Sequence, residues 1–171
     1  MQPRPTLLNS CASAATAAEA RFRINYGDTP PRAARIIALD EHAAAIVRRV
    51  GDQRWRGGHF LVFESAVPVN GRDGHPADAT LRADDGSEVL LTEELKDADV
   101  AVMIGTANTR AEAARVVGDA CAARKIMSAG LIVSDSDEVH EAVSALRPHA
   151  MVLVVLADEN DVPPILTALR F

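Results

Sequence analysis

The sequence predicts an α/β fold in which a mostly parallel sheet lies between two layers of helices. Short apolar runs alternate with helical segments along most of the chain. Residues 100–104 (VAVMI) contain no polar side chain, which is typical of a strand covered on both faces. Because crossovers between parallel strands are right-handed, the favoured architecture is a doubly wound, mostly parallel, six-stranded Rossmann-like sheet.

The elements can be placed in order along the chain. We expect six strands, at 6–8, 35–39, 59–63, 100–104, 130–133 and 151–156. We expect helices at 13–24, 41–50, 110–124, 138–146 and 162–169, with a further short helix capped by Thr92. Residues 67–91 differ, because a Pro-, Gly- and Asp-rich loop precedes a hairpin whose turn contains Gly86. The prediction is a single domain over residues 1–171 with this β-hairpin as a small insertion.

Composition and charge argue against two classes of partner, nucleic acids and membranes. The 171 residues include 18 Lys and Arg and 24 Asp and Glu, for a formal charge of −6, without a sustained basic run. We therefore expect no nucleic-acid and no membrane partner. The sequence shows neither a secretory leader pattern nor an apolar run of membrane-spanning length. With only two cysteines, Cys11 and Cys121, a soluble cytoplasmic protein is the expectation.

The predicted functional site lies at the carboxyl ends of the strands. Open α/β sheets bind ligands there, where the strand order reverses and helix N-termini offer unpaired N–H groups. In a 3-2-1-4-5-6 order, the turns after the first and fourth strands would flank this point and could hold a phosphate or a carboxylate. The candidate ligand-binding residues are Ser10, Cys11, Ser13, Asp40, Gly105, Thr106, Asn108 and Thr109.

The same turns have a second interpretation, because each of them precedes a helix. Ser, Thr, Asn and Asp are common N-caps, so Asp40 either caps the helix after it or contacts a sugar or amine of the ligand. Residues 10–15 lack the glycines of a dinucleotide-binding fingerprint. The sequence therefore predicts a small-molecule ligand, and a nucleotide is one candidate, but it identifies no cofactor.

Two further hypotheses come from other function classes. An enzyme could use Cys11, whose thiolate a helix N-terminus would favour, with His42 as its base. The competing interpretation of Cys11 is a small buried residue. No metal site is expected, because the histidines lack metal-ligand spacing and no C-x-x-C occurs. The last hypothesis is a structural or assembly module with a degenerate site, whose apolar helix faces form a homo-oligomer.

Two segments resemble parts of a known family. Residues 36–45 (IIALDEHAAA) resemble the second-strand turn, and residues 98–107 (ADVAVMIGTA) the strand before the phosphate loop, of the tubulin/FtsZ family. The resemblance spans most of the chain and implies a six-stranded Rossmann-like sheet with GTP at the carboxyl ends. The family's phosphate-loop glycines are absent, since residues 108–112 are NTRAE, and the chain has no room for its second domain. The resemblance therefore implies the fold rather than GTP hydrolysis.

Overall fold

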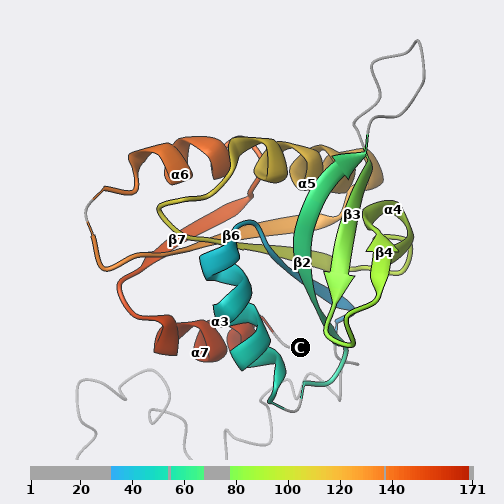
Figure 1. Ribbon diagram of the computed structural model, residues 1–171, viewed down its shortest axis with the longest axis horizontal. Helices are drawn as coiled ribbons and strands as arrows, with labels where there is room; N and C mark the ends of the chain where they lie inside the picture. Colours follow the sequence, from blue (N-terminus) through green and yellow to red (C-terminus); the bar gives the residue numbers. More distant parts are fainter. Residues whose placement is uncertain (1–31, 54, 68–77, 137, 170–171) are drawn as a thin grey trace, which may run out of the picture. The chain divides into compact units, whose positions relative to one another are not determined.

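A seven-stranded sheet with helices on both faces organises the protein (Figure 1). The computed structural model describes residues 32–53, 55–67, 78–136 and 138–169, which all belong to one compact unit. In chain order the elements are β1 (Ala34–Ala38), α3 (Glu41–Gly51), β2 (Gly58–Val67), β3 (Asp78–Ala83), β4 (Glu88–Leu90), α4 (Leu91–Glu94), β5 (Val100–Gly105), α5 (Ala111–Arg124), β6 (Met127–Val133), α6 (His140–Leu146), β7 (Val152–Leu156), a 3₁₀ turn η2 (Glu159–Asp161) and α7 (Val162–Ala168).

The predicted α/β class is confirmed, but the sheet is mixed and has seven strands rather than six. Its order is β4-β3-β2-β1-β5-β6-β7. Strands β2, β1, β5, β6 and β7 are parallel, whereas β3 and β4 are antiparallel to their neighbours. The hairpin was expected as an appendage, yet β3 pairs with β2 along most of its length. This is possible because β2 continues to Val67, beyond the predicted end at Phe63, and offers a free edge.

The expected central position of the first predicted strand is wrong. β1 pairs in parallel with β2 on one side and with β5 on the other, so both of its edges are taken. The direct pairing of β1 with β5 differs from the expected 3-2-1-4-5-6 order. Residues 6–8 lie outside the described residues, as do Ser10, Cys11 and Ser13. The chain adds β2 beside β1 and later returns to place β5 on the opposite side. The strand order thus reverses between β1 and β5.

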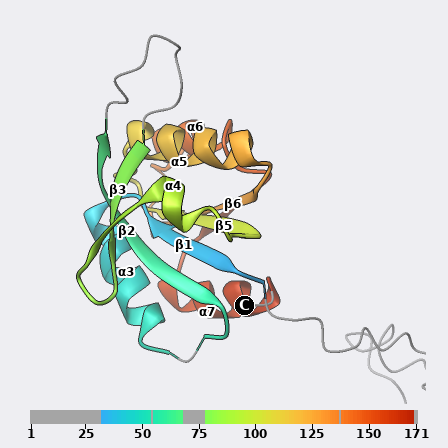
Figure 2. The same ribbon diagram turned by 90° about the vertical axis from the view of Figure 1, so that its right-hand side faces the viewer.

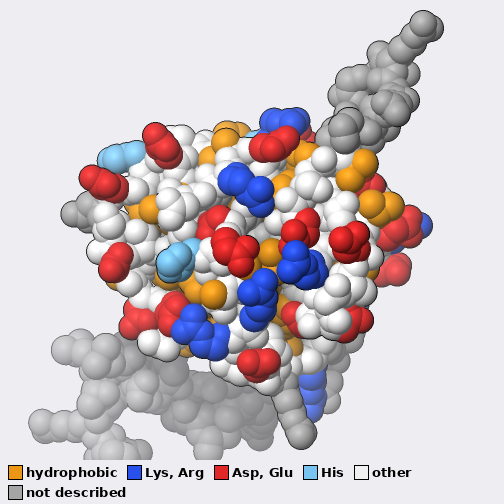
Figure 3. Space-filling view, in the orientation of Figure 1, with side chains coloured by type: hydrophobic (Ala, Val, Ile, Leu, Met, Phe, Trp, Pro, Cys, Tyr) orange, Lys and Arg blue, Asp and Glu red, His pale blue; other side chains and the backbone are white. Residues whose placement is uncertain are grey.

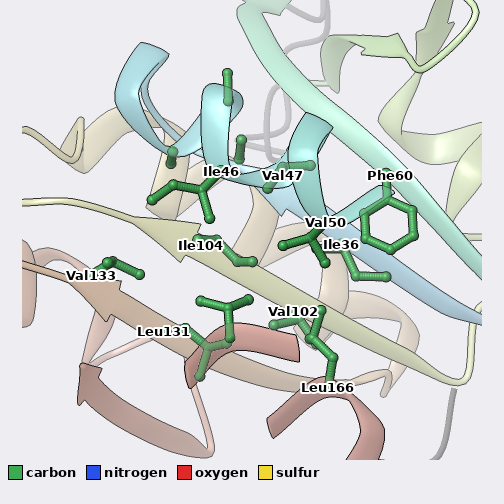
Figure 4. Close-up of a cluster of buried hydrophobic side chains, with 14 of the residues drawn as sticks. Ile36, Ile46, Val47, Val50, Phe60, Val102, Ile104, Leu131, Val133 and Leu166 are labelled. Atoms are coloured by element: carbon green, nitrogen blue, oxygen red, sulfur yellow. The ribbon is translucent and has the colours of Figure 1, made fainter. Parts of the chain in front are cut away.

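Two apolar layers hold the sheet. Figure 2 shows α5 and α6 over one face of the sheet and α3 and α7 over the other. Alternate residues of one strand serve the two layers: Ile36 packs into the α3 and α7 side, and Ile37 into the α5 and α6 side. Figure 4 shows the first layer, in which Ile46, Val47 and Val50 of α3 lie over the strands. Because helices cover both faces of the sheet, the central strands consist mostly of apolar residues.

The short helix α4 begins differently from the prediction. Its N-cap is Leu90, which has no capping side chain, rather than Thr92. The Thr92 hydroxyl instead donates to Asp78 Oδ2 at 2.6 Å, and the Thr92 N–H donates to Asp78 Oδ1 at 3.1 Å. These bonds tie α4 to the first residue of β3. Among the described helices, none is both long and apolar enough to cross a bilayer.

Candidate functional site

The reversal of strand order defines the candidate site. In an open α/β sheet the ligand crevice lies beyond the carboxyl ends of the strands at such a point. Here Asp40 follows β1, and Thr106 follows β5. The structure therefore brings together Asp40, Gly105, Thr106, Asn108 and Thr109, five of the eight predicted residues.

Asp40 is the centre of a hydrogen-bond network that joins the two turns. Its Oδ1 accepts from the Ala43 N–H at 2.8 Å and from Thr106 Oγ1 at 3.2 Å, and its Oδ2 accepts from the Thr106 N–H at 2.8 Å. The residue is only 6% exposed. The bond to Ala43 makes Asp40 the N-cap of α3, as one of the two sequence interpretations predicted. The carboxylate thus occupies the place at the α3 N-terminus where an anionic ligand would bind.

Thr109 and Gly105 shape the turn after β5. Thr109 Oγ1 lies 2.7 Å from the Thr106 carbonyl oxygen and 3.3 Å from Asp40 Oδ2, so its single proton goes to the nearer carbonyl. A Cβ added at Gly105 would lie 2.0 Å from Thr109 Oγ1. Gly105 is therefore required for the close approach of Thr109, and its role is packing within the turn.

Two pockets open on either side of Asn108. The first, of about 390 Å³, lies at the carboxyl ends of β5, β6 and β7 and is lined by His42, Thr106, Asn108, Ser134, Asp135 and Asp158. We call it the acidic pocket. The second, of about 410 Å³, lies at the carboxyl end of β1 beside the middle of β2 and is lined by Asp40, Glu41, Phe63, Glu64, Asn108 and Arg110. We call it the Arg110 pocket.

The acidic pocket carries more negative than positive charge. Asp135, Asp158 and Glu159 line it, whereas His42 is its one titratable base. The Glu159 carboxylate pairs with Arg49 on α3, with Nη2 and Oε2 2.9 Å apart. Asp158 Oδ1 accepts from the Asn160 N–H at 2.8 Å and so caps η2. This pocket suits hydroxyl or amine donors better than a phosphate.

The Arg110 pocket contains a positioned cation. Arg110 Nη2 donates to the Phe63 carbonyl at 3.2 Å, and the guanidinium carbon lies 5.3 Å from the centre of the Phe63 ring. Glu64 is engaged elsewhere, since its Oε1 lies 2.6 Å from Arg82 Nη2. Arg110 also stands at the N-cap of the fourteen-residue helix α5, which has no side-chain cap, so the N–H groups of its first turn have no capping side chain among the described residues.

Sequence reasoning missed several residues of this rim. Arg110, Asp135 and Asp158 each follow the end of a parallel strand by a few residues, which was the signal that could have selected them. His42 lies in the acidic pocket, as expected for a residue after the second predicted strand. Cys121 is buried on the inner side of α5, and burial raises the pKa of its thiol to about 11. Its chemistry is therefore that of a core residue.

Charges of both signs are mixed across the surface. On the described part of the face in Figure 3, Lys and Arg side chains lie among Asp and Glu. Within the described ranges, no three His, Cys, Asp or Glu side chains are grouped closely enough to hold a metal ion. No known protein family, curated protein or solved structure matches the chain. The resemblance to the tubulin/FtsZ family stays a prediction.

Proposed function

We propose that the protein binds a small phosphorylated or carboxylated ligand, such as a nucleotide, at the carboxyl ends of β1 and β5. The observation that carries this proposal is the pair of chemically different pockets that share Asn108. Each pocket is within the size range of small-molecule sites, and both border the reversal of strand order. A ligand with an anionic end and a hydroxylated end would match the two pockets.

The anionic end belongs in the Arg110 pocket. The bond to Phe63 uses one of the five N–H donors of Arg110, which leaves others for a phosphate or carboxylate. The open N-terminus of α5 adds backbone N–H groups and a partial positive charge. Of the acids of this pocket, Glu64 is paired with Arg82, whereas Asp40 and Glu41 oppose an anion, so Arg110 and the α5 N-terminus must outweigh their charge.

The hydroxylated end belongs in the acidic pocket. Asp135 and Asp158 offer carboxylate acceptors there, and Ser134 offers a hydroxyl. Sugar hydroxyls and ring amino groups are the donors that such acceptors bind. A ribose or a similar polyol therefore fits the charge of this pocket, whereas a second phosphate does not.

Thermal denaturation in the presence of nucleotides, dinucleotides and sugar phosphates tests the proposal. Each compound is compared with its unphosphorylated partner, the matching nucleoside or sugar. A ligand that binds only the native state raises the melting temperature. For the best ligand, Arg110→Gln is expected to weaken binding about 10- to 100-fold, the effect of losing a charge-assisted hydrogen bond. Binding of the unphosphorylated partner is expected to be unchanged.

Arg115→Gln is the matched control, because Arg115 lies on the same helix, is exposed and pairs with Asp119. It is expected to leave affinity unchanged. The proposal is wrong if no phosphorylated or carboxylated compound raises the melting temperature. It is also wrong if Arg110→Gln and Arg115→Gln bind the best ligand equally well.

Enzymatic activity is a second candidate because His42 and Asp135 both line the acidic pocket. A histidine there could exchange a proton with a bound hydroxyl group. Cys11, the other proposed reacting group, lies outside the described residues. Incubation of the best ligand with the protein, followed by mass spectrometry of the ligand, tests this candidate. A product that forms with the wild type and not with His42→Asn supports it, and an unaltered ligand contradicts it.

A further inference from the structure

A larger pocket, of about 660 Å³, lies at the opposite end of the strands from the two pockets of the candidate site. It is formed by the C-terminal half of α5, the first residues of β6 and the segment between α6 and β7. Met127 and Met151, two of the few large hydrophobic side chains that the described chain exposes, line it. Its other apolar lining residues are Ala122, Ile126, Pro148 and Ala150. This size and a mostly apolar lining are typical of small-molecule sites.

Hydrogen bonds and close packing hold the walls of this pocket in place. The His149 carbonyl accepts from Ser128 Oγ at 2.7 Å, and the Met151 N–H donates to the Ser128 carbonyl at 2.9 Å. Gly118, inside α5, lets the segment before β7 approach the helix, because a Cβ there would lie 2.2 Å from His149 Cβ. The walls are therefore ordered without a ligand, which lowers the entropic cost of binding one.

Lys125 supplies a positive charge to the pocket. It follows the last residue of α5 with a φ of 58°, and it is the one residue other than glycine with a positive φ among those described. Glycine adopts this conformation with less strain and is the usual residue at such a position. None of the ion pairs among the described residues involves Lys125. Its ammonium group is therefore available to an anionic ligand.

Asp119 limits the charge of that ligand, because it is the one acid that lines the pocket. Its Oδ2 lies 3.6 Å from Arg115 Nη1, and its Oδ1 lies 3.6 Å from His149 Nδ1. Both oxygens thus face groups other than Lys125, but the carboxylate still opposes an anion. A phosphate dianion has a larger desolvation cost than a carboxylate, and a pocket with one cation and one acid does not offset it.

We propose that this pocket binds a small monocarboxylic acid with an apolar aliphatic or aromatic body. The carboxylate pairs with Lys125, and the apolar body lies against the methionines, whose flexible thioether side chains adapt to different shapes. The site is separate from the proposed ligand site at the carboxyl ends of β1 and β5, and the inference does not rest on that proposal.

Titration calorimetry of the full chain with hexanoate, phenylacetate and hydrocinnamate tests the proposal. Each acid is compared with its primary amide, which has nearly the same shape and no charge. At least one acid is expected to bind, and its amide is expected to bind about 10-fold more weakly, the effect of losing a charge-assisted contact. Phenyl phosphate is expected to bind more weakly than phenylacetate.

Two variants locate the site. Ala122→Trp fills the pocket from an exposed position of α5 and is expected to abolish binding. Ala123→Trp is the matched control, since Ala123 is also exposed on α5 but does not line the pocket, and it is expected to bind as the wild type does. Lys125→Gly is expected to bind the acid only as well as the amide. It is also expected to fold at least as well as the wild type, because glycine tolerates the positive φ.

The proposal is overturned if none of the acids binds, or if an acid and its amide bind equally well. Equal affinities of Ala122→Trp and Ala123→Trp would place the binding elsewhere and would also overturn it. Arg110→Gln is expected to leave these affinities unchanged, so failure here is distinguishable from failure of the proposed function. A loss of acid binding in Arg110→Gln but not in Lys125→Gly would assign the acid to the Arg110 pocket and overturn the proposal.

Discussion

The central strand β1 has a buried charge at each end, and the two charges are compensated differently. Arg35 near the amino end and Asp40 beyond the carboxyl end are each 6% exposed. Arg35 Nε lies 2.9 Å from Glu94 Oε2 and donates to the Glu94 carbonyl at 2.7 Å. Asp40 has no such counter-ion among the described residues, where its oxygens accept from backbone N–H groups and a threonine hydroxyl.

This difference separates an ion-paired end from an end that borders the candidate site. At the amino end, an ion pair fastens α4 to the centre of the sheet. At the carboxyl end, the donors to Asp40 belong to the turns that border both pockets. Under the proposed function, stability and ligand binding share residues only at the carboxyl end, and substitutions at the two ends are expected to differ in effect.

The largest effect is expected for Glu94→Gln. This change leaves the Arg35 guanidinium buried without a counter-charge, which costs about 3–5 kcal/mol of unfolding free energy when one partner of a buried pair is removed. Urea denaturation followed by circular dichroism measures it. Glu93→Gln, at an exposed neighbour paired with Lys96, is expected to cost less than about 0.5 kcal/mol. Equal costs for the two variants would show that Arg35 does not depend on Glu94.

The next largest effect is expected for Asp40→Ala. The variant leaves the N–H groups of Ala43 and Thr106 without their acceptor, and the lost cap and hydrogen bonds together cost about 2–3 kcal/mol. Unlike Glu94→Gln, it is also expected to lower the affinity for the best ligand, because the turn that carries Asn108 loses its hydrogen bonds to Asp40. Glu41→Ala, at the exposed next residue, is the control. Unchanged ligand affinity in Asp40→Ala would contradict the link between stability and site.

A smaller effect is expected for Gly105→Ala. The new methyl group would meet Thr109 Oγ1, and relief of the clash costs about 1–2 kcal/mol, as for other overpacked sites. In a Thr109→Ala background the same substitution is expected to cost less, because the obstructing side chain is gone. A double-mutant cycle from urea denaturation measures the difference. Additive costs would mean that Gly105 and Thr109 do not contact each other.

The smallest effect is expected for Thr109→Val, which keeps the side-chain shape and removes the hydroxyl. Loss of its bond to the Thr106 carbonyl is expected to cost about 0.5–1 kcal/mol. Thr167→Val removes a similar hydroxyl bond, to the Pro163 carbonyl on the exposed surface of α7, and is expected to cost less. Calorimetric melting temperatures of the two variants check the order. The reverse order would argue against a special role for the turn after β5.

Local sequence patterns were enough to find most elements. The runs at 35–39, 100–104 and 130–133 became β1, β5 and β6, because a strand buried on both faces needs mostly apolar side chains. Arg35 is the charged exception in β1. The N-cap role of Asp40 was also predictable, since it depends on a residue only three positions away. Periodicity and capping are local properties, so the sequence carries them directly.

Strand partners and charge compensation were not predictable in this way. The hairpin joined the sheet because β2 runs past Phe63, and β1 met β5 across 66 positions, the separation that also joins Asp40 to Thr106. The acids of the acidic pocket come from two separate strand ends, those of β6 and β7, which only the order of the sheet brings together.

By itself, the sequence determined which segments are strands and helices and that both faces of the sheet are covered. The tertiary structure alone decided which strands are neighbours, where the strand order reverses and which polar groups line the two pockets. The physical reason is that helix and strand periodicity arises from neighbouring residues, whereas pairing and burial depend on hydrogen bonds and contacts between residues distant in the chain.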